Sequence, residues 1–193
     1  RDRSMMIITA HYGNWELFAA RMAQLGKLTV LARKNNNPRI EEVINDTRQH
    51  NNIRVLDRSD PKAPREMIKM GKQGGHILGI LMDQDTSRIK GIFSPFMGIP
   101  ALTPSGPASI AVRDLFDVYV AVLRPVNNGR HEFVFEGPLT IPDDSNRDAQ
   151  VQKTTDLFNQ YLSKIILSDP QYWVWNHRRW RRKPAETEIK EGA

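Results

Sequence analysis

The chain of 193 residues has the length of one ordinary globular domain, and its 39% of hydrophobic residues can form a core. Its longest apolar runs, such as Val118–Leu123, have six residues, whereas a membrane-spanning helix needs about 20. The absence of cysteine excludes disulfides, zinc ribbons, iron–sulfur clusters and a thiol nucleophile.

Positive charge is concentrated near the carboxyl terminus. Lys and Arg outnumber Asp and Glu by 28 to 22, and five of the basic residues occupy the six positions 178–183. Because the last ten residues carry a net charge of −2, the first 177 carry only +3. A basic, tryptophan-flanked segment on an otherwise balanced domain indicates an anionic surface or partner.

Apolar runs typical of strands alternate with segments of helical periodicity. In chain order, the sequence predicts a strand, a helix, a strand, a helix, a strand, a helix and a central parallel strand: Met5–Ala10, Trp15–Leu25, Leu28–Ala32, Pro38–His50, Ile53–Leu56, Pro64–Lys72 and His76–Met82. Asp83–Thr103 has neither period, so we expect a long loop there.

The rest of the chain predicts a short helix, a hairpin and a long amphipathic helix: Pro104–Val112, Tyr119–Arg124 with His131–Glu136, and Arg147–Leu167. This order indicates an α/β fold, with a mixed, mostly parallel central sheet and helices on both faces. We expect one domain over residues 1–183, followed by an exposed tail at 184–193.

The segment from His11 to Glu16 places a histidine and a carboxylate between a strand and a helix. His11 lies at the carboxyl end of the first strand, where open α/β sheets bind ligands, and Gly13 permits a sharp turn after it. We expect Glu16 to hold one imidazole nitrogen, so that the other takes a proton from a hydroxyl. The alternative is that Glu16 only complements the helix dipole and that His11 is an ordinary loop residue.

Two more polar segments follow predicted strands. Asp83 and Asp85 follow the central strand and either bind a cation or cap turns; with no histidine cluster beside them, we expect no metal site. Arg33, after the second strand, and Arg48 suit a phosphate group, or they belong to a solvated charged face.

The segment Trp173–Arg182 interleaves tryptophan with arginine. This pattern suits single-stranded nucleic acid or a membrane interface, and we expect Trp173–Lys183 to help hold the protein on an anionic membrane. In the alternative, Trp173 and Trp175 are core residues and the arginines are solvated. Nucleic acid is not the expected partner, because the first 177 residues carry a net charge of only +3. The chain has no G-x-S-x-G, P-loop or G-x-G-x-x-G motif.

Taken in order, these segments resemble the late acyltransferases of lipid A biosynthesis, the lauroyl/myristoyl group of the glycerolipid acyltransferase-like enzymes. His11 to Glu16 matches that group's motif of a histidine, four residues and an acid. The motif alone is weakly specific, but the ordered set is strongly specific and covers about Ile7 to Pro184: Arg33–Pro38 with Arg48, Gly79–Asp85, Gly91–Thr103 and Gln171–Trp180.

The resemblance implies a glycerol-3-phosphate-acyltransferase-like fold and an enzyme without a cofactor. It implies that His11 is the general base and that Glu16 orients it. The residues that it implies at the substrate site are Arg48, Arg33, Asp83, Asp85 and Asn14.

The implied reaction moves a fatty acyl group from acyl carrier protein to a hydroxyl of a lipid A precursor, in lipopolysaccharide biosynthesis at the cytoplasmic face of the inner membrane. The alternative is an acyl-CoA-dependent enzyme acting on another glycolipid, such as a phosphatidylinositol mannoside. A non-catalytic nucleic-acid-binding module is less consistent with the charge. Family members carry a membrane-anchoring helix before the histidine motif, and here ten residues precede it; we expect either a fragment or a member without the anchor.

Overall fold

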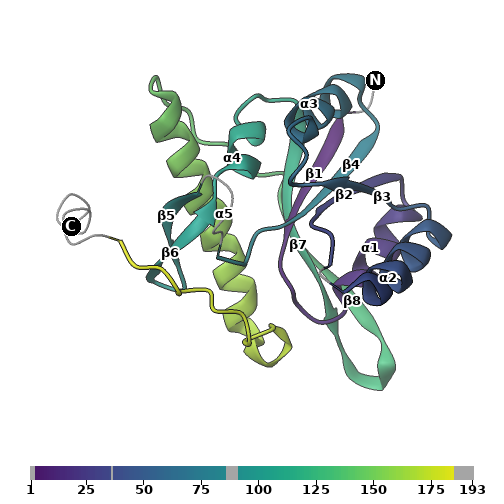
Figure 1. Ribbon diagram of the computed structural model, residues 1–193. Helices are drawn as coiled ribbons and strands as arrows, with labels where there is room; N and C mark the ends of the chain where they lie inside the picture. The colour runs from purple at the N-terminus through teal and green to yellow at the C-terminus, as the bar shows by residue number, and fades with distance from the viewer. Residues whose placement is uncertain (1–2, 36, 86–90, 185–193) are drawn as a thin grey trace.

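The computed structural model describes residues 3–35, 37–85 and 91–184. A six-stranded sheet, in the order β3-β2-β4-β1-β7-β8, carries helices on both faces, and a two-stranded hairpin lies apart from it (Figure 1). The predicted α/β class is therefore confirmed. Apart from Pro184, the expected tail at 184–193 lies outside the described residues. The strands are β1 (Ser4–Thr9), β2 (Lys27–Ala32), β3 (Arg54–Asp57), β4 (His76–Leu81), β5 (Gly91–Phe96), β6 (Ile99–Pro104), β7 (Phe116–Pro125) and β8 (His131–Glu136).

The middle of the sheet is parallel and buried on both sides. β1 lies between β4 and β7, parallel to both, and Thr9 is paired with Leu81. Along β1, Met6 and Ile8 belong to one core cluster and Ile7 to the other, because successive side chains of a strand point to opposite faces. Only the last pairing, β7 with β8, is antiparallel in this sheet.

Different helices cover the two faces. α1 (Trp15–Ala23) begins at Asn14, whose side chain accepts a hydrogen bond from the backbone of Leu17, and packs Phe18 on one face. The other face carries α3 (Ala63–Gln73), α4 (Gly106–Ala111) and the long α5 (Arg147–Ser168). Among the described residues, no helix has both the length and the apolar character that a bilayer span requires.

Helix α2 (Pro38–His50) forms where the sequence predicts it, yet buries none of its residues. Ile40 and Val43 stay exposed, and Ile44 is only partly buried. The helix connects β2 to β3 and carries Arg48 in its last turn. The helix therefore contributes little to the core and mainly positions Arg48.

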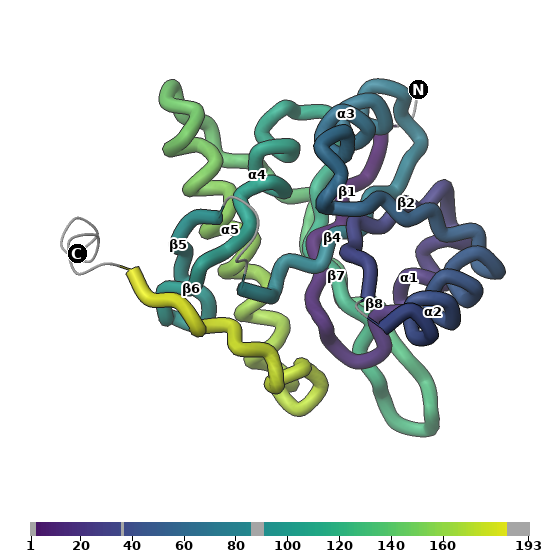
Figure 2. The backbone as a smooth tube through the Cα atoms, in the orientation of Figure 1, coloured from purple at the N-terminus to yellow at the C-terminus, as the bar shows by residue number. Residues whose placement is uncertain are grey.

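The prediction of a long loop over Asp83–Thr103 is wrong in its second half, where β5 and β6 form an antiparallel hairpin. Pro95 and Pro100 face each other across it, and prolines in a run argue against a central strand. The turn uses positive φ at Met97 and Gly98, and methionine is not a typical residue for such a turn. The hairpin avoids the main sheet and packs on α5 instead (Figure 2).

Candidate active site

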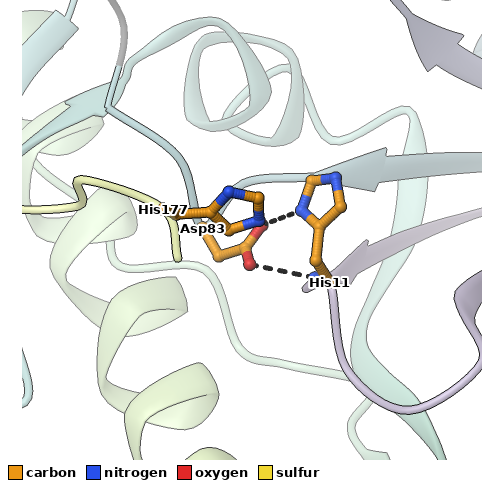
Figure 3. A group of neighbouring side chains, drawn as sticks. All are labelled: His11, Asp83 and His177. Atoms are coloured by element: carbon orange, nitrogen blue, oxygen red, sulfur yellow. Dashed lines mark hydrogen bonds and ion pairs between the residues drawn. The ribbon is translucent and has the colours of Figure 1, made fainter. Parts of the chain in front are cut away.

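His11 and Asp83 meet at the carboxyl ends of two neighbouring parallel strands. Because Thr9 of β1 pairs with Leu81 of β4, two further residues on each strand bring His11 beside Asp83. Nδ1 of His11 lies 2.8 Å from Oδ1 of Asp83, and the backbone N–H of His11 donates to Oδ2 at 2.9 Å (Figure 3). The carboxylate thus holds a proton on Nδ1 and leaves Nε2 as the nitrogen that accepts one.

The side chain of Asp83 is fully buried, and its hydrogen bonds hold the carboxylate in place against His11. Its Oδ2 also accepts a 2.8 Å hydrogen bond from the indole of Trp173. Burial alone would raise the pKa of Asp83, but the hydrogen bonds from His11 and Trp173 and the charge of His11 lower it below its ordinary value. An ionised, fully enclosed carboxylate orients the imidazole; it has no surface with which to touch a substrate.

The sequence predicts that Glu16 holds the imidazole of His11, but in the structure Glu16 is bound to Arg48 instead. Its carboxylate accepts two hydrogen bonds from the guanidinium of Arg48, at 2.6 and 3.2 Å, and so joins α1 to α2. Asp83 already occupies Nδ1 of His11. The turn between His11 and α1 is nevertheless tight: Gly13 has φ +54°, and a Cβ there would lie 2.8 Å from the carbonyl oxygen of Leu123.

A second histidine, His177, completes the cluster and was not singled out from the sequence. Its ring lies edge-on to that of His11, 4.7 Å between centroids (Figure 3). The amide nitrogen of Gln84 lies 3.3 Å from Nε2 of both histidines. Burial and the nearby charge of His11 lower the pKa of His177. Gln84, which contacts both histidines, was visible in the sequence only as the residue between Asp83 and Asp85 at the end of a strand.

His11, Asp83 and His177 also offer potential metal-ligating atoms within 4.8 Å of one another. Histidine nitrogen and carboxylate oxygen are ordinary ligands of zinc. Both oxygens of Asp83, however, already accept hydrogen bonds, from His11 and Trp173. The cluster is satisfied as a hydrogen-bonded network.

A basic pocket of about 400 Å³ opens beside His11. It is lined by four basic residues: Arg33, Lys34, Arg48 and Arg58. Arg33 lies just after β2, as predicted from the sequence. Within the part of the chain that the structure describes, the side chains of Arg33, Lys34 and Arg58 have no ion pair. Burial and the charge of Arg33 lower the pKa of Arg58, so these cations gain from an anionic ligand.

An apolar cavity of about 280 Å³ adjoins the basic pocket. The two share four lining residues, among them Leu31 and Arg58. Farther in, the cavity is lined by Met67 of α3, Ile80 of β4 and Pro107 of α4. A cationic chamber with a hydrocarbon-like extension suits a molecule that has a charged head and an alkyl chain.

Two residues of the carboxyl-terminal segment Trp173–Lys183, Trp173 and Arg179, are buried in the core, while five others are exposed. Trp173 is 3% exposed and bridges to Tyr12, and Arg179 is fully buried, with Thr103 and the carbonyl of Leu102 as hydrogen-bond acceptors. Burial lowers the pKa of Arg179 to about 10. Of the three tryptophans, Trp175 is half exposed.

Asp85 and Asn14, the remaining expected site residues, have other contacts. Asp85 is 3.7 Å from Arg182 and lines a smaller pocket with Gln84 and His177. Asn14 uses its side-chain oxygen to cap α1.

The family model for the bacterial lipid A biosynthesis acyltransferases matches residues 1–182. The chain belongs to this family. It is 25% identical over 188 residues to the lipid A biosynthesis lauroyltransferase of Escherichia coli and 22% identical over 187 residues to the palmitoleoyltransferase of the same organism. A lipid A biosynthesis acyltransferase of Haemophilus influenzae is 24% identical over 157 residues, which are 80% of this chain and 48% of that protein.

Against the two Escherichia coli acyltransferases, the alignments cover 95% of this chain but 58% of each relative. The family expected from the ordered motifs is thereby established, and it is a family of transferases.

Proposed function

We propose that the chain transfers a fatty acyl group from the thioester of acyl carrier protein to a hydroxyl of a lipid A precursor. The observation that carries this proposal is the hydrogen-bonded His11–Asp83 pair beside a basic pocket that adjoins an apolar cavity. A transferase of this kind needs a base, a place for phosphates and a place for an alkyl chain. The three lie side by side here.

In the proposed reaction, Nε2 of His11 takes the proton of the acceptor hydroxyl while that oxygen attacks the thioester carbonyl carbon. Asp83, bonded to Nδ1, holds the ring in the required tautomer and stabilises the imidazolium that forms. The tetrahedral intermediate then expels the thiolate, which takes the proton from His11. The carbon–sulfur bond breaks, the ester bond forms, and His11 returns to its neutral state.

The cations divide into two roles in this proposal. Arg48 is held bidentately by Glu16, and a guanidinium fixed in this way can stabilise the negative charge that develops on the thioester oxygen. Glu16 thereby serves the reaction through Arg48. Arg33 and Arg58, without acidic partners in the described structure, bind a phosphate of the acceptor.

The apolar cavity takes the alkyl chain of the donor. Its walls of Met67, Ile80 and Pro107 offer no charged group, and Leu31 continues the apolar lining into the basic pocket. Burying each methylene there contributes about 0.8 kcal/mol. The chain would therefore be held with its thioester near His11.

Because both substrates carry lipid chains, we place the reaction at a membrane surface, at the cytoplasmic face of the inner membrane. The competing proposal is an acyl-CoA-dependent enzyme that acylates another glycolipid. It would use the same base and the same apolar cavity, so geometry does not separate the two.

The test offers the full chain acyl carrier protein and CoA thioesters of several lengths, each with a lipid A precursor and with a phosphatidylinositol mannoside, and measures the acylated lipid. We expect transfer from the carrier protein to the lipid A precursor, and its abolition in His11→Ala. Transfer only from acyl-CoA to the other glycolipid would support the alternative. Full activity of His11→Ala would refute the mechanism.

A further inference from the structure

Gln84 lines two pockets, which approach the histidine pair separately. The first is the basic pocket beside His11. The second, of about 160 Å³, is lined by Gln84, Asp85, His177, Arg178 and Arg181. With the acceptor's phosphate assigned to the first pocket, the second is a route by which another reactant can reach the same base.

Two exposed cations, Arg178 and Arg181, line the second pocket, and Lys183 follows two residues after Arg181. Arg178, Arg181 and Lys183 are exposed, and none of their side chains has an ion pair within residues 3–35, 37–85 and 91–184. Arg182 is turned inward, 3.7 Å from Asp85. The other oxygen of Asp85, Oδ2, is buried and has no hydrogen-bond partner in the described structure. The pocket thus has an unsatisfied acceptor inside and unpaired positive charge at its rim.

This rim is fixed to the body of the protein. Arg179, between two of the cations in sequence, is fully buried, stacks on Phe96 with 4.7 Å from its guanidinium carbon to the ring centroid, and donates hydrogen bonds to β6. Trp173 and Trp180 pack against the same ring. Figure 2 shows the segment running beside β5 and β6. The cations are held in a defined arrangement, as specific docking requires.

We propose that Arg178, Arg181 and Lys183 form the docking surface for an acidic acyl carrier protein, which delivers its thioester through the second pocket. The inference rests on the proposed function and adds the place where the donor binds. Opposite charge on the two surfaces speeds and orients their encounter. Asp85 Oδ2 accepts a hydrogen bond from an amide N–H of the slender arm that carries the thioester.

An anionic membrane is the other partner that such cations suit, and the structure favours the carrier protein. Membrane docking by this segment would use its three tryptophans as interfacial anchors, but only Trp175 is exposed; Trp173 is in the core and Trp180 is partly buried against Phe96. Arg178 and Arg181 also line a pocket with His177, whose ring lies 4.7 Å from that of His11 between centroids. A bilayer surface would not enter this pocket, whereas the arm that carries a thioester can.

The test compares two triple variants of the full chain that lose the same charge. Arg178, Arg181 and Lys183 are changed to Gln in one. In the control, three exposed residues of α3 that have no ion pair in the described structure are changed to Gln: Arg65, Lys69 and Lys72. Steady-state acyl transfer is measured with acyl carrier protein thioester and with the acyl-pantetheine thioester, which lacks the protein, at about 0.05 and 0.3 M salt.

For the first variant, we expect kcat/KM with the carrier thioester to fall at least about tenfold further than kcat/KM with acyl-pantetheine, and its salt dependence to weaken. The control variant should keep the parent's ratio. Equal loss with both donors, or parental carrier kinetics together with lost binding to anionic vesicles, would overturn the docking surface. If the parent itself uses no carrier thioester, the proposed donor is wrong, which is a different result.

Discussion

Replacing Asp83 with asparagine tests the central contact of the proposed active site. The side chain keeps its size, but one carboxylate oxygen becomes an N–H₂ group. Asp83 accepts hydrogen bonds from three donors: the backbone N–H of His11, Nδ1 of His11 and the indole N–H of Trp173. The asparagine oxygen can stay with the two donors on Oδ2. Its amide nitrogen then faces Nδ1 of His11 and donates to it, so the proton moves to Nε2 and the base loses its free electron pair.

The expected loss in kcat is about 10²–10⁴-fold, the range of general-base contributions and of the wrong tautomer. A thousandfold loss corresponds to about 4 kcal/mol of transition-state stabilisation. Folding also suffers, because a hydrogen bond to a buried charged group contributes about 1.5–3 kcal/mol. The fold should survive this cost, since Asn keeps two of the three contacts.

The assay combines acyl transfer over a range of pH with urea unfolding of the same preparations. Asp143→Asn, at an exposed position, is the matched control and should behave as the parent. Glu16→Gln separates this mechanism from a His–Glu pair: it acts only through Arg48 and should lower kcat less than Asp83→Asn does. A folded Asp83→Asn enzyme with parental kcat, or a larger loss in Glu16→Gln than in Asp83→Asn, would refute the reasoning.

Three other predictions concern the cations, the second histidine and metals. Changing Arg33 or Arg58 to Gln should raise KM for a phosphorylated acceptor about tenfold, the loss expected for one charge-assisted hydrogen bond, with a smaller change for a dephosphorylated acceptor. Because burial lowers the pKa of His177 in the fold, the unfolded chain takes up its proton first as pH falls below about 6.5, so stability falls there. His177→Gln should reduce this loss between pH 7.5 and 5.5 in urea unfolding; an unchanged slope would contradict the burial argument. Chelators should leave acyl transfer intact, since both oxygens of Asp83 already accept hydrogen bonds, and activity restored by a divalent ion after chelation would make the cluster a metal site.

The interpretation of the carboxyl-terminal segment shows where a local pattern becomes ambiguous. Tryptophan interleaved with arginine predicts an interface on composition alone. The structure places Trp173 under Asp83 and Arg179 against Phe96, because β5 and β6 form a wall that the segment covers. A charge run appears solvated in a sequence; only packing shows which of its members are buried.

Local pattern in the sequence determined much of this protein. Continuous apolar runs specified the parallel strands, strand–helix alternation specified the α/β class, and the position of His11 after the first strand placed it at the binding edge. Gly13 followed from the need for a tight turn, which its φ confirms. These features depend on periods of two or 3.6 residues, which short windows contain.

The tertiary structure alone decided which carboxylate serves His11. Glu16 is five residues away and Asp83 is 72, but β4 lies next to β1 in the sheet, and paired parallel strands end side by side. The helix that follows β1 meanwhile directs Glu16 to Arg48 on α2. Strand neighbours are chosen by long-range burial of both sheet faces, which no local period records, and so the partner of His11 could not be predicted from spacing.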